Sequence, residues 1–84
     1  MFNKNQICSK INELYPDLGV CGKDIQISFD NDNHAWVVDL KKDVRHLKTF
    51  IEISDAEACI DNGRCLGMVF QITQLKENIS SISH

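Results

Sequence analysis

Three short segments between residues 25 and 51 alternate apolar with polar side chains, and this alternation constrains the fold more than any other feature. Successive side chains of a strand point to opposite faces, so a period of two predicts strands with one buried and one solvated face. Polar turns at residues 30–34 and around Lys42-Asp43 join neighbouring segments directly, which favours an antiparallel meander. The positions expected on the buried face are Ile25, Ile27 and Phe29, then Trp36, Val38 and Leu40, then Leu47, Thr49 and Ile51.

A helix is predicted ahead of the meander, over residues 5–15. Ile7, Ile11 and Leu14 recur at helical spacing, with polar residues on the other face. Pro16 ends this helix because its ring pushes Tyr15 out of the α region. Residues 17–23 then form a loop.

Two further helices are predicted after the meander. Ser54 followed three residues later by Glu57 has the pattern of a capping box before a short helix, and Gly63 suits the end of that helix. A longer helix covers about residues 66–79. We therefore predict an α+β fold in the order α-β-β-β-α-α, with a three-stranded antiparallel meander covered on one face by helices. The 84 residues leave room for one domain, residues 1–79, with a frayed polar tail at 80–84.

The predicted last helix carries apolar side chains in two sectors. One sector is Met68, Ile72, Leu75 and Ile79, and the nearly opposite one is Leu66, Val69 and Phe70. A helix that covers a sheet needs only one apolar face. The second sector is therefore covered either by the first helix or by a partner chain, commonly an identical copy in a homodimer. The residues expected at the interaction surface are Met68, Phe70, Ile72, Leu75 and Ile79.

Four cysteines in so short a chain raise thiol chemistry as a hypothesis. The N-terminal residues lack the basic start and apolar run of a secretory signal, which predicts a cytoplasmic location where thiols stay reduced. We therefore expect free cysteines. Cys8 and Cys59 fit apolar helix faces and are expected in the core. Cys65 is expected to be the most reactive thiol, since Arg64 and a helix N-terminus favour its thiolate, with Cys21 the next.

The cysteine spacings match no metal-binding motif. Zinc sites use short ligand pairs such as C-x-x-C, whereas twelve residues separate Cys8 from Cys21 and five separate Cys59 from Cys65. Glycine-rich phosphate loops and nucleophile motifs are absent from the sequence. We expect no cofactor, no metal and no enzymatic activity, and a four-cysteine metal site assembled by the fold is the alternative.

Four of the nine basic residues gather in the second hairpin: Lys41, Lys42, Arg45 and Lys48. One interpretation is a patch for an anion or an acidic partner. The other is a solvated strand end whose lysines discourage edge-to-edge pairing, and the nearby Asp39 and Asp43 favour it. A net charge of −3 and a pI near 5.4 argue against a nucleic-acid partner. No apolar run is long enough to cross a membrane.

The predicted element order resembles the α-β-β-β-α order of double-stranded-RNA-binding domains. These domains carry a lysine-rich cluster at the start of the last helix, where residues 64–69 here hold Arg64 as their one basic residue. The resemblance therefore implies a packing scheme without RNA binding. We expect a small cytoplasmic binding module that acts through protein–protein contacts. The alternative is a thiol-dependent redox or metal-binding protein that uses Cys65 with Cys21 or Cys59, and exposure of Cys65 beside a second sulfur distinguishes the two.

Overall fold

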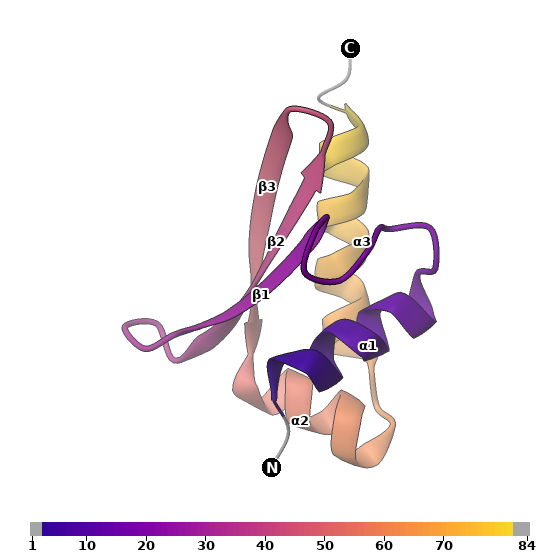
Figure 1. Ribbon diagram of the computed structural model, residues 1–84. Helices are drawn as coiled ribbons and strands as arrows, with labels where there is room; N and C mark the ends of the chain where they lie inside the picture. The colour runs from indigo at the N-terminus through magenta and orange to yellow at the C-terminus, as the bar shows by residue number, and fades with distance from the viewer. Residues whose placement is uncertain (1–2, 82–84) are drawn as a thin grey trace.

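A computed structural model describes residues 3–81 and confirms the α+β fold. Within these residues the elements are α1 (Lys4–Leu14), β1 (Ile25–Asp30), β2 (Ala35–Lys42), β3 (Arg45–Glu52), α2 (Ile53–Asn62) and α3 (Leu66–Ser81). The strands form one antiparallel sheet in the order β1-β2-β3, as the alternating pattern predicted. The helices lie on one side of this sheet. Helix α3 runs alongside the strands, and α1 crosses in front of α3 in the view of Figure 1.

The register of the sheet explains which face the helices cover. Ile27, Val38 and Thr49 lie opposite one another in adjacent strands, in a row that points toward the helices. The next row, Ser28, Val37 and Phe50, points to the other side, where Ser28 and Phe50 are exposed. One face of the meander is therefore buried and the other is open to solvent.

The core lies between the covered sheet face and the helices. It includes Ile7 and Ile11 of α1, Ala56 and Cys59 of α2, and the stripe Met68, Ile72, Leu75 and Ile79 of α3. This stripe packs in the core against the sheet, and every member is at most 4% exposed. A partner cannot contact these four residues while the chain is folded. This corrects the predicted interaction surface, of which only Phe70 remains exposed.

Helix α1 begins with a capping box that was not predicted from the sequence. The side chain of Asn3 accepts a hydrogen bond from the Gln6 backbone N–H, and the Gln6 side chain accepts one from the Asn3 N–H. Both bonds satisfy donors that a helix N-terminus leaves free. The helix ends at Leu14, with Tyr15 as C-cap immediately before Pro16, as predicted.

Helix α2 begins earlier than predicted. Strand β3 ends at Glu52 and α2 begins at Ile53, so the strand passes into the helix without a connecting loop. Glu52 is the N-cap and makes no side-chain capping bond, so the predicted capping box from Ser54 to Glu57 is wrong. Gly63 ends the helix in the left-handed region at φ 70°, which confirms its predicted position.

Helix α3 continues to Ser81, so residues 80–81 of the predicted tail belong to it and residues 82–84 lie outside the described part of the chain. Its 16 residues carry two apolar sectors of unequal burial, of which only the stripe on the sheet is enclosed. Between residues 3 and 81, no helix combines the length and apolar character that a membrane crossing requires.

Candidate functional site

All four cysteines lie within the described residues, and they form two disulfides. Cys8 bonds to Cys21 and Cys59 bonds to Cys65, which leaves no free cysteine. The prediction of free thiols is therefore wrong. It rested on the compartment expected from the N-terminal sequence, whereas the fold brings each pair of sulfurs into bonding contact.

The Cys8–Cys21 disulfide ties the loop after α1 back onto that helix. Cys8 lies in the buried face of α1, whereas Cys21 is exposed. The loop is closed by hydrogen bonds from the backbone N–H groups of residues 23, 24 and 25 to the carbonyl oxygen of Val20. The side-chain amide of Asn12 lies 2.9 Å from the Cys21 sulfur. This bond thus joins an exposed residue of the loop to a buried residue of the helix.

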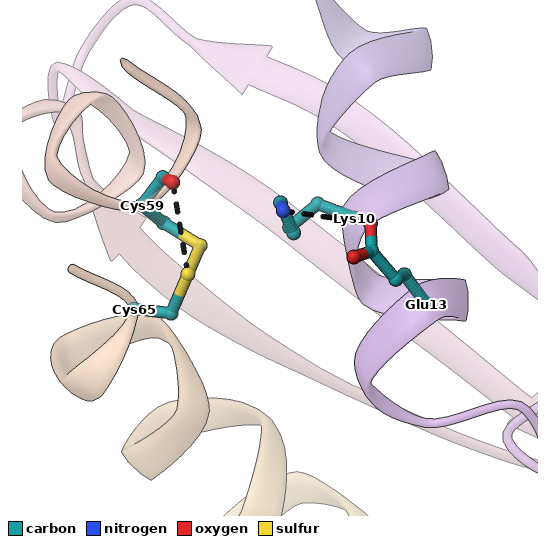
Figure 2. A network of polar contacts seen from close by, with 4 residues as sticks. All are labelled: Lys10, Glu13, Cys59 and Cys65. Atoms are coloured by element: carbon teal, nitrogen blue, oxygen red, sulfur yellow. Dashed lines mark hydrogen bonds and ion pairs between the residues drawn. A yellow bond between two sulfur atoms is a disulfide. The ribbon is translucent and has the colours of Figure 1, made fainter. Parts of the chain in front are cut away.

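The Cys59–Cys65 disulfide joins the end of α2 to the residue before α3 (Figure 2). The turn between them is closed by the left-handed Gly63 and by the Arg64 N–H, which donates to the Ala58 carbonyl at 2.8 Å. The Cys65 sulfur lies 3.7 Å from the carbonyl oxygen of Cys59. Cys65 is half-buried beside a second sulfur, but its bonded sulfur has no thiolate for Arg64 to stabilise. The structure does not bring Cys65 to Cys21.

A pocket of about 210 Å³ adjoins the Cys8–Cys21 bond. Both sulfur-bearing residues line it, together with Lys4 of α1 and Gln26 of β1. The Gln26 side-chain amide donates to the Gly22 carbonyl at 2.7 Å and so fixes one wall. This hollow gives a small molecule access to both residues of the Cys8–Cys21 bond, and sequence spacing gives no indication of it.

An exposed apolar surface lies at the start of α3. Leu66 is 84% exposed and Phe70 is 58% exposed, and they are neighbours one turn apart. We call these two residues the apolar contact face. Tyr15, the C-cap of α1, reaches α3 beside this face: its hydroxyl donates to the Val69 carbonyl at 3.3 Å and also lies against Thr73. The first helix therefore does not cover Leu66 and Phe70.

The basic residues of the second hairpin do not form one surface. Lys41 pairs with His46 across the strands and shares the open sheet face with Lys48. Lys42 pairs with Arg45 on the opposite face, where Arg45 makes an ion pair with Asp43 at 3.2 Å. The predicted anion patch is thus divided between two faces, and the solvated-end interpretation fits better.

Among residues 3–81, no group of three or more histidine, cysteine, aspartate or glutamate side chains is arranged to hold a metal. Hydrogen bonds from the Asn33 side chain and backbone lower the pKa of Asp30, which also accepts a bond from the Asp32 N–H. These bonds stabilise the turn between β1 and β2 and are structural.

Comparisons with known proteins found no matching family model, no similar curated protein and no similar solved structure. The functional inference therefore rests on the residues of this chain alone.

Proposed function

We propose that the chain is a small non-enzymatic binding module that acts through protein–protein contacts at the apolar contact face. The observation that carries this proposal is the exposure of Leu66 and Phe70 side by side on α3. Adjacent exposed apolar side chains on a rigid element are typical of contact sites, and aromatic residues are enriched where such contacts contribute most. A folded monomer gains nothing from this exposure, whereas a partner chain would remove it from water.

The proposed partner is a protein, and a second copy of the chain is the first one to test. The net charge of −3 favours a protein over a nucleic acid. The alternative function, thiol chemistry at Cys65, needs a free thiol there, and the Cys59–Cys65 bond provides one only after reduction. The apolar contact face requires no such step and is the simpler basis for a function.

The proposed cytoplasmic location requires the two disulfides to be stable in a reducing compartment. Cytoplasmic glutathione and thioredoxin keep most thiols reduced, so both disulfides would have to survive them. Alkylation of the protein trapped in intact cells, followed by mass analysis, measures the number of closed bonds. Alkylation of all four cysteines would support the cytoplasmic location, whereas two closed disulfides would point to an oxidising compartment.

Sedimentation velocity of the intact protein tests the proposed contact. We expect the unmodified chain to self-associate as its concentration rises, and Leu66→Gln with Phe70→Gln to weaken this association at least about tenfold. Val44→Gln is the matched control, because Val44 is 92% exposed in the β2–β3 turn. This turn lies beside the C-terminal end of α3, at the opposite end of the helix from Leu66 and Phe70 (Figure 1). Association of the control should equal that of the unmodified chain.

A photo-crosslinking amino acid at position 70, compared with one at position 44, extends the test to other proteins. If all three chains stay monomeric and position 70 crosslinks no more than position 44, the proposal is wrong.

A further inference from the structure

The two residues of the Cys8–Cys21 bond differ in their exposure to solvent. Cys21 is exposed in its loop, whereas Cys8 is 4% exposed and lies between the fully buried Ile7 and Ile11. A thiolate opens a disulfide by attacking one sulfur and displacing the other, so access decides which sulfur is attacked. The exposed Cys21 is therefore the favoured point of attack for an incoming thiolate.

The pocket beside this bond has the charge that suits an anionic thiol. Lys4 is its one charged lining residue, and Asn5 and Gln26 add side-chain amides. A second hollow is also lined by Cys21, and its one charged lining residue is Asp17. A carboxylate-bearing thiol is therefore attracted to the hollow beside Lys4 and repelled from the hollow beside Asp17.

We propose that Cys21 is a site of reversible modification by an anionic low-molecular-weight thiol of the glutathione class. The thiolate attacks the Cys21 sulfur, a bond forms between the two sulfurs, and the Cys8–Cys21 bond breaks. Cys8 leaves with the bonding electron pair and takes up the proton that the incoming thiol released. The products are a mixed disulfide at Cys21 and a thiol at Cys8.

The step is reversible because α1 keeps Cys8 close to Cys21. Ile7 and Ile11 hold this helix in the core on both sides of Cys8. The side-chain amide of Asn12 donates to the Cys21 sulfur at 2.9 Å and so holds Cys21 beside α1. The Cys8 thiolate can then attack Cys21, re-form the native bond and release the small thiol.

The sequence makes the exchange easy to map. The intact protein is incubated with reduced glutathione, quenched in acid, denatured, alkylated with N-ethylmaleimide and digested with trypsin. Trypsin cleaves after Lys10 and Arg64, so each cysteine of an opened bond falls in its own peptide. We expect glutathione on Cys21 and maleimide on Cys8 in the early samples. Glutathione on Cys8, or earlier opening of Cys59–Cys65, would overturn the proposal.

Two charge variants test the role of the pocket. Lys4→Glu should slow opening by glutathione about fivefold and leave opening by the uncharged 2-mercaptoethanol unchanged. This variant should fold, because an acidic residue in the first turn of a helix is favourable. Lys23→Glu makes the same charge change in the loop, but residue 23 does not line the pocket. It should therefore slow opening by glutathione clearly less than Lys4→Glu does. Equal slowing by both variants, or slowing of 2-mercaptoethanol by Lys4→Glu, would contradict the assigned pocket.

Discussion

The two disulfides contain the same chemical bond but act on different kinds of structure. Cys8–Cys21 spans 13 positions and attaches a loop without helix or strand to α1, whereas Cys59–Cys65 spans 6 and closes a turn between two helices. The second turn is also held by the backbone bonds of Gly63 and Arg64 and by the buried side chains of α2 and α3. The Cys21 loop has backbone hydrogen bonds of its own, but none of residues 16–24 is fully buried. The first bond therefore attaches a weakly packed loop to the core, whereas the second reinforces a turn whose two helices are already held by packing.

The largest expected effect comes from removing each bond in turn. Cys8→Ala with Cys21→Ala should lower the free energy of unfolding by about 3 kcal/mol, and Cys59→Ala with Cys65→Ala by about 2 kcal/mol, because the longer loop gains more entropy when released. Each pair contains one buried cysteine, so the loss of packing is similar in both variants. Urea unfolding measures both values. The reverse order would show that the shorter turn depends on its bond more than its hydrogen bonds suggest.

The glycines in the two connections provide a second comparison. A Cβ atom at Gly19 would lie 2.5 Å from the Asp24 Cβ at a φ of +139°, whereas one at Gly63 would meet nothing within 4 Å at a φ of +70°. Gly19→Ala should therefore cost about 2 kcal/mol or more, and Gly63→Ala about 1 kcal/mol. Gly63→Asn serves as a control, since asparagine tolerates the left-handed region better than alanine. Equal costs for the two alanine variants would mean that the Gly19 loop moves aside freely.

Tyr15 links the two disulfide regions, since it follows α1 and its hydroxyl bonds to α3. Tyr15→Phe should cost about 1 kcal/mol, because it removes the hydroxyl and leaves the ring near Lys76. A double-mutant cycle with Thr73→Val measures how much of this cost belongs to the pair. An additive cycle would show that the Tyr15 hydroxyl stabilises the chain through Val69 alone.

The β1–β2 turn contains neither disulfide and gives the smallest expected effect. Hydrogen bonds to the charged form lower the pKa of Asp30 from 3.8, so its contribution to stability is present above that pH and is lost as the pH falls through the lowered pKa. Asp30→Asn should therefore remove part of the loss of stability on acidification below about pH 4. Urea unfolding of both chains across this range measures the difference. An identical pH dependence would show that the turn bonds do not favour the carboxylate.

Features set by neighbouring residues were predictable from the sequence, and features set by the path of the chain were not. The alternation around Val38 and the left-handed position of Gly63 follow from local geometry. The start of α2 does not, because β3 passes into α2 without a loop. The helix therefore begins at Ile53, before the capping pattern expected at Ser54. The disulfide partners depend on where the loop after α1 and the turn after α2 place Cys21 and Cys65 in space. Sequence spacing alone does not show this. The division of Lys41 from Lys42 was predictable, since adjacent residues of a strand face opposite sides.

The direct passage from β3 into α2 determines where the chain tolerates a change of length. An extra residue between Glu52 and Ile53 would turn the whole of α2 by about 100°. Ala56 would then leave the core, and Cys59 would be carried away from Cys65. An extra residue beside Val44, in an exposed hairpin turn, displaces no buried side chain. Insertions and deletions among relatives of this chain should therefore collect in the hairpin turns and be absent at the boundary between β3 and α2.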